Sequence, residues 1–136
     1  MELKHIDHIG IAVKNLTAAI NFYENILGLK CYKIEEVPDQ KVKTAFLQIG
    51  QTKIELLEST ETDGPIGKFI EKKGEGVHHI AYSVENLSSA LSELNENKIQ
   101  LIDKQPRKGA DDMNIAFLHP KSTGGVLIEL CQRINK

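Results

Sequence analysis

The stretch DHIGIAVKNL at residues 7–16 returns as HHIAYSVENL at residues 78–87, so His79 corresponds to His8. At the same spacing, AFL at residues 45–47 matches AFL at residues 116–118. After a shift of three residues, Ile54-Glu55-Leu56 matches Ile128-Glu129-Leu130. A duplicated module that folds about a pseudo-twofold axis would bring equivalent residues together. We therefore expect two His and two Glu side chains to converge, and divalent metals bind such a donor set.

Length and charge indicate a small enzyme-sized domain. The chain has 136 residues and a formal net charge of −2, and its basic residues are scattered rather than clustered. Neither a nucleic acid nor a membrane surface is therefore an expected partner. Charged residues interrupt every apolar run before the roughly 20 residues that span a bilayer, and the N-terminus does not resemble a signal peptide. These features predict one domain over residues 1–136, located in the cytoplasm. Cys31 and Cys131 form no CxxC motif and are expected to be packing residues on strands.

The first repeat, about residues 4–60, predicts a strand, a helix and three further strands. Residues 5–13 alternate in polarity as a strand does, and Asn15 can cap a helix that continues to Ile26 or Leu27. Gly28 is expected in the position that follows a helix C-terminus. Further strands are predicted near residues 29–37, 43–49 and 52–58, with a tight turn at Gly50-Gln51.

The second repeat, about residues 76–133, predicts the same order. A strand near 77–84 precedes a helix from Asn86, and strands follow near 99–104, 113–118 and 125–132. Between the repeats, Gly64-Pro65 opens a connector helix that ends at Gly74, over about residues 64–74. The expected fold class is therefore α+β, with two tandem βαβββ modules.

Each candidate ligand also has an ordinary structural explanation. A single strand His is more often a hydrogen-bonded structural residue than a ligand, but the recurrence at His8 and His79 favours a shared function. His5 and His78 have no His at the repeat offset, and we expect neither to bind metal. An unpaired carboxylate within an apolar strand would cost several kcal/mol, so Glu55 could instead pair with a Lys such as Lys53, or face solvent. Two Glu residues at equivalent positions favour metal ligation.

Several further segments carry a family resemblance. They are FY at residues 22–23 with LG at 27–28, GPI at 64–66, GVHHIA at 76–81, and HPKS at 119–122 followed by GVLIEL at 125–130. With DHIGIAV at residues 7–13, they make the chain similar to the vicinal oxygen chelate superfamily, and within it to the methylmalonyl-CoA epimerases. The last segment is the most specific, because other members typically have an Asp-Pro-Asp-Gly-like turn before the final Glu. The resemblance implies paired βαβββ modules that form a cupped, incomplete barrel around a metal.

The resemblance also implies a reaction and its residues. His8, His79 and Glu129 would ligate one divalent ion, with Glu55 in the fourth position, where some epimerases have Gln. The ion could be Co, Zn, Ni or Mn. The substrate would be an acyl-CoA, methylmalonyl-CoA, whose α-proton is removed to give a metal-stabilised enolate. The protein would be a homodimer, as superfamily members commonly are.

Inversion of the α-carbon requires an acid/base group on each face. Glu129 is expected to serve one face. Some epimerases carry a Glu on the strand before the first metal-binding Glu, but Thr44 occupies that position here. Glu55 or a bound water could serve the second face instead, or the chain does not epimerise. Lys121 and Ser122 could bind the substrate carboxylate or the CoA phosphates, or they form a solvated turn.

Two other functions are also compatible with the sequence. Lactoylglutathione lyase (glyoxalase I) also uses two His and two Glu around a metal, and Glu55 rather than Gln is consistent with it. Against the lyase, Ala12 occupies the position where such enzymes usually carry an Arg for the glutathione carboxylate. A metal-free binding module of the bleomycin-resistance kind is the third possibility, although such modules generally lack the paired ligands.

Overall fold

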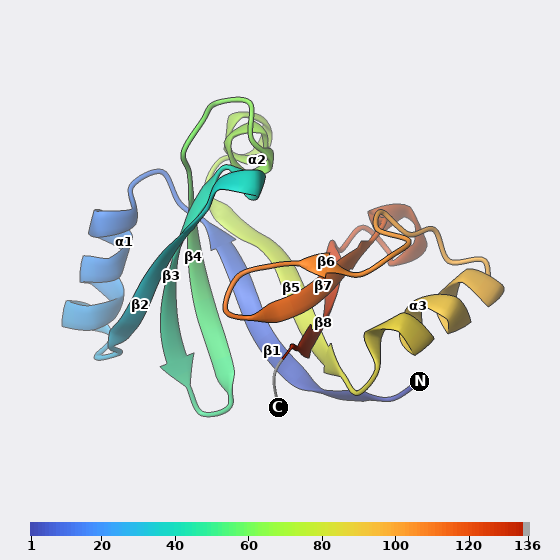
Figure 1. Cartoon of the computed structure of the whole chain (residues 1–136). Helices are drawn as coiled ribbons and strands as arrows, with labels where there is room; N and C mark the ends of the chain where they lie inside the picture. Colours follow the sequence, from blue (N-terminus) through green and yellow to red (C-terminus); the bar gives the residue numbers. More distant parts are fainter. Residues whose placement is uncertain (135–136) are drawn as a thin grey trace. The chain divides into compact units, whose positions relative to one another are not determined.

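A computed structural model describes residues 1–134 of the chain (Figure 1). It contains two compact units. One comprises residues 8–78, and the other comprises residues 1–7 together with the residues from His79 onward. Each unit corresponds to one sequence repeat, except that residues 1–7 belong with the second repeat and residues 76–78 belong with the first.

The unit of residues 8–78 has the βαβββ order that the first repeat predicts. Its elements are β1 (Leu3–Ala12, which begins in the other unit), α1 (Leu16–Asn21), the π-helical turn η1 (Phe22–Ile26), β2 (Cys31–Val37), the 3-10 turn η2 (Pro38–Gln40), β3 (Val42–Ile49) and β4 (Thr52–Ser59). The predicted cap is confirmed, because the Asn15 side chain accepts a hydrogen bond from the backbone N–H of Ala18. Gly28 follows the helix with a φ of +77°, as a C-terminal glycine should. The predicted helix reaches its expected end, but its last five residues are π-helical.

The strands of this unit pair in the order β2-β3-β4-β1. β2, β3 and β4 are antiparallel neighbours, whereas β1 lies parallel to β4. One sheet face packs against α1 through a buried apolar cluster that includes Leu16, Leu47 and Leu56. Side chains alternate between faces along a strand, so the neighbouring residues His8, Phe46 and Glu55 belong to the opposite face.

The predicted connector helix is α2 (Pro65–Lys73), with Gly64 at its N-cap and Gly74 at its C-cap. Ile66 of α2 is buried against Ala12, Val42 and Leu57. The connector is therefore a packed element of this unit, as predicted, rather than a flexible linker.

The second unit also has the βαβββ order. Its elements are β5 (Gly76–Val84, which begins in the other unit), α3 (Leu87–Glu96), β6 (Arg107–Lys108), β7 (Met113–Leu118), the 3-10 turn η3 (Pro120–Ser122) and β8 (Ile128–Arg133). The strands pair in the order β5-β8-β7-β6, with β5 parallel to β8. Asn86 caps α3 by accepting from the Ser89 N–H, which confirms the second predicted cap. The cluster beneath α3 includes Leu87, Leu91 and Leu130.

The predicted strand near residues 99–104 is wrong. Leu101 forms only an isolated bridge with Leu118, and the second strand of this module is the two-residue β6. The Asp103 carboxylate accepts the backbone N–H of Phe117 at 2.9 Å, and the N–H groups of Ile102 and Asp103 both point to the Phe117 carbonyl. The Asp103 side chain thus accepts a hydrogen bond that a backbone carbonyl would accept in a regular strand pair. Pro106, which has no N–H to donate, stands just before the short strand.

Two further features concern the cysteines and the length of the helices. Cys31 and Cys131 lie on β2 and β8 as predicted, and both are thiols. Within residues 1–134, no helix is long and apolar enough to cross a bilayer.

Candidate metal centre

His8 and Glu55 form a close buried pair in the unit of residues 8–78. β1 and β4 run parallel, with His8 opposite Lys53 and Gly10 opposite Glu55. His8 is 4% exposed and Glu55 is 6% exposed. The Nδ1 atom of His8 lies 3.2 Å from the Oε2 atom of Glu55.

Lys53 is a third buried charged group beside this pair. It precedes Glu55 by two residues, so both side chains lie on the same sheet face. Its Nζ lies 3.9 Å from the Oε2 atom of Glu55, and 5.9 Å from the centre of the Phe46 ring. Glu55 therefore does contact Lys53, as one of the structural alternatives proposed, but its contact with His8 is shorter.

His79 and Glu129 form the equivalent pair in the second unit. Glu129 on β8 lies opposite Ala81 of the parallel strand β5, two residues after His79. Both side chains are 6% exposed, and the Nε2 atom of His79 lies 3.1 Å from the Oε1 atom of Glu129. The edge of the His79 ring contacts Phe117, with 5.5 Å between ring centres.

The donor chemistry of each pair fits a divalent ion. Imidazole nitrogen and carboxylate oxygen bind such ions at about 2.0–2.2 Å. The separations of 3.2 Å and 3.1 Å within the pairs are shorter than two such distances, so both atoms of a pair can contact one ion. His8, Glu55, His79 and Glu129 are thus buried residues of the types that hold a divalent metal.

The repeat extends to the aromatic residues beside the carboxylates. Phe46 lies opposite Glu55 across β3 and β4, and Phe117 lies opposite Glu129 across β7 and β8. A cation covers each ring: the Lys33 ammonium lies 5.1 Å from the centre of Phe46, and the Arg107 guanidinium lies 5.6 Å from that of Phe117. The features that recur in the two modules therefore include a Phe ring with a cation beside it, in addition to the His and Glu residues.

Lys33 and Glu35 also lie on the sheet face that carries Phe46 and Glu55, which their sequence pattern did not indicate. Their alternation on β2 was visible, but the sequence could not show which side of β2 faces Glu55. The register settles this: Lys33 lies opposite Phe46, and Glu35 lies opposite Thr44. Thr44 itself is 1% exposed.

Lys121 and Ser122, which were predicted to bind substrate, lie on the exposed turn η3. The backbone N–H of Lys121 donates to Nδ1 of His119 at 3.1 Å. The Ser122 hydroxyl accepts the backbone N–H of Gln100 at 2.9 Å. The turn is therefore held in place by its own hydrogen bonds, and the Lys121 side chain lies at the surface.

His78, which was predicted not to bind metal, packs edge-to-face against Phe69 of α2, with 5.0 Å between ring centres. Its neighbour His79 instead contacts Glu129. This difference is consistent with the alternation of side chains along β5.

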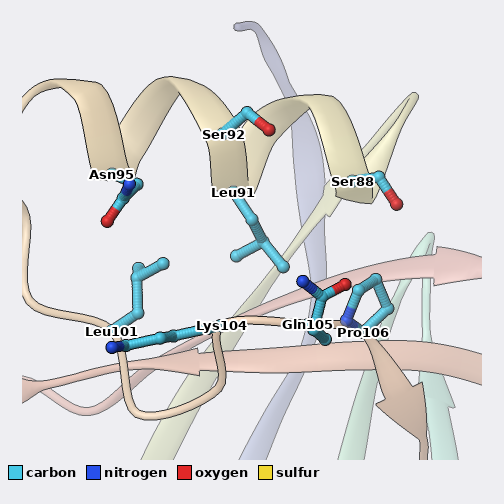
Figure 2. Close-up of a pocket in the computed structure, with 8 residues that line it drawn as sticks. All are labelled: Ser88, Leu91, Ser92, Asn95, Leu101, Lys104, Gln105 and Pro106. Carbon is cyan, nitrogen blue, oxygen red and sulfur yellow. The ribbon is translucent and has the colours of Figure 1, made fainter.

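The second unit has a groove away from these pairs, with a volume of about 380 Å³. Figure 2 shows it between α3 and the loop of residues 101–106, with Leu91 and Leu101 projecting into it and Lys104 at the loop side. It contains none of the predicted site residues.

Residues 7–117 match the model of the glyoxalase/bleomycin resistance protein/dioxygenase superfamily. The uncharacterized protein YqjC of Bacillus subtilis is 48% identical over 96% of this chain and 93% of its own length. The mitochondrial methylmalonyl-CoA epimerase of Homo sapiens is 40% identical over 96% of this chain and 74% of its own length. Among solved structures, a Streptomyces coelicolor methylmalonyl-CoA epimerase variant in complex with 2-nitronate-propionyl-CoA has a TM-score of 0.95 at 36% identity. That match covers 98% of this chain and 97% of the other, and it confirms the predicted glyoxalase-like α+β fold.

Proposed function

Because this chain belongs to the glyoxalase/bleomycin resistance protein/dioxygenase superfamily, we propose that it is an isomerase that epimerises methylmalonyl-CoA. The observation that carries the proposal is the pair of buried His–Glu contacts at equivalent positions of two modules. The similarity to epimerases along nearly the whole chain supports the choice of reaction within the superfamily.

In this proposal, His8, Glu55, His79 and Glu129 together hold one divalent ion. An ion in this position would stabilise the negative charge that develops on the substrate oxygens when the α-proton leaves. The two His side chains, as neutral imidazoles, would complete the set without adding charge. Burial of the four residues would exclude water from the reacting atoms and so strengthen their electrostatic interactions.

Glu129 is the proposed acid/base group for one face of the α-carbon. A carboxylate can accept the α-proton and return it, and Glu129 is held in place by its contact with His79. Lys121 and Ser122 are proposed to bind the anionic groups of the CoA substrate near the surface. The exposure of Lys121 is compatible with that role, since phosphates would reach it from solvent.

The test is isotope exchange with a single epimer of methylmalonyl-CoA in heavy water. The wild-type protein with metal should incorporate deuterium at the α-carbon and scramble its configuration. Glu129→Gln should abolish both outcomes. Absence of exchange in the wild type, together with turnover of the hemithioacetal of methylglyoxal and a thiol, would replace the epimerase by the lyase. Absence of both activities and of bound metal would favour the binding module.

A further inference from the structure

The geometry points to Glu35 as the acid/base group that serves the second face of the α-carbon. This inference rests on the proposed epimerase function. Inversion through proton removal requires a group that delivers a proton to the face opposite the one attacked. Glu129 can serve only one face, so a second carboxylate or equivalent group is needed.

The strand register places Glu35 on the sheet face that carries Glu55. Glu35 lies directly opposite Thr44, and directly opposed residues of antiparallel strands project from the same face. Thr44 precedes Phe46 by two residues, and Phe46 lies opposite Glu55. Glu35, Phe46 and Glu55 therefore project from one face of the unit.

The Glu35 carboxylate contacts an ammonium group that borders Phe46 on this face. Its Oε1 atom lies 3.4 Å from Nζ of Lys33, and that ammonium lies 5.1 Å from the centre of the Phe46 ring. The Lys53 ammonium is 5.9 Å from the centre of the same ring and contacts Glu55. Phe46 is thus bordered by two ammonium groups, one in contact with Glu35 and the other with Glu55.

Glu35 is also more accessible to a substrate than Glu55. The Glu55 side chain is 7% exposed and contacts both His8 and Lys53. The Glu35 side chain is 35% exposed. Thr44, a small residue beside it, has a hydroxyl that is too weak an acid to exchange protons near neutral pH. Of Glu35 and Glu55, Glu35 is therefore the more accessible to a substrate.

The proposed step is balanced in protons and charge. The Glu129 carboxylate takes the α-proton as the C–H bond breaks, and the electron pair delocalises into the thioester to give the enolate. A proton carried by Glu35 is then delivered to the opposite face, and Glu35 is left as a carboxylate. The reverse reaction exchanges the two roles, and proton exchange with water resets both groups.

The experiment measures α-proton exchange and inversion separately, from each epimer of methylmalonyl-CoA, on the metal-loaded full chain in heavy water. Glu35→Gln should reduce inversion about 100-fold or more, in line with the usual contribution of a general acid/base. One epimer should still exchange its α-proton with retention, because Glu129 still serves that face. The other epimer should neither exchange nor invert. A residue with a merely structural role would not produce this asymmetry.

Glu36→Gln is the matched control. Glu36 is the next residue of β2, is exposed, and projects from the opposite face. The Glu36→Gln variant should leave α-proton exchange, inversion and metal content unchanged. Glu35→Gln should retain the metal content and melting temperature of the wild type. Glu55→Gln is the comparison variant for the other carboxylate of this face, since the amide oxygen can remain a ligand but the side chain can no longer act as an acid/base group.

The outcomes separate this inference from the proposed function. Wild-type inversion rates in Glu35→Gln would overturn the role of Glu35 while leaving the epimerase proposal intact. Equal loss of exchange from both epimers in that variant would also overturn it, because one face should remain active. Exchange without inversion in Glu55→Gln, beside normal inversion in Glu35→Gln, would assign the second face to Glu55. A wild-type protein that neither exchanges nor inverts would overturn both proposals.

Discussion

Replacing Lys53 by Met should destabilise the metal-free protein by about 1–3 kcal/mol. The ammonium and the Glu55 carboxylate are 3.9 Å apart, and each side chain is only 7% exposed. At an effective dielectric constant of about 20, their attraction is about 4 kcal/mol before desolvation is counted. Met relieves the desolvation of the ammonium but leaves the Glu55 carboxylate buried. The expected loss is smaller than the roughly 3–5 kcal/mol for a pair with no other partner, because His8 remains in contact with Glu55.

The assay is urea unfolding of the chelator-treated protein at neutral pH. Lys43→Met is the control, because Lys43 is an exposed lysine on the neighbouring strand β3, and the change should shift the unfolding free energy by about 0.5 kcal/mol or less. The double variant Lys53→Met/Glu55→Leu should regain most of the lost stability, since it buries neither charge. If Lys53→Met proved no more destabilising than Lys43→Met, the idea that Lys53 compensates the buried carboxylate would be refuted.

Three further predictions concern the metal and the helix caps. His8→Ala and His79→Ala should each lose bound metal and activity together, whereas His5→Ala should lose neither; elemental analysis of the purified variants checks this. Chelation should lower the melting temperature of the wild type and metal should restore it, because an ion present at 100 times its dissociation constant stabilises the folded state by about 2.7 kcal/mol; an unchanged melting curve after verified removal would contradict this. Asn15→Ala and Asn86→Ala should each destabilise by about 1 kcal/mol in denaturant unfolding, because each removes the side-chain acceptor of a helix N-cap; equal stability to the wild type would show that the caps contribute little.

Local patterns explain how much of the fold could be predicted from the sequence. The recurring segment around His8 and His79 indicated two modules, and Asn15 and Asn86 were recognisable as caps because cap chemistry depends on a few adjacent residues. The strand near 99–104 could not be excluded in the same way. Its failure depends on the Asp103 side chain reaching the backbone of Phe117, a contact between residues 14 apart in sequence.

For the candidate site, the sequence by itself determined which residues to consider. His8, Glu55, His79 and Glu129 are the repeated polar residues of apolar strands, and all four are buried. Only the tertiary structure showed what surrounds them, because the register between strands decides which side chains share a face. It turned Glu35 and Lys33, which the sequence pattern did not single out, toward the face of Phe46. The alternation of side chains along a strand shows that the strand has two faces. Only its pairing with neighbouring strands decides which face lies on the side of the candidate ligands.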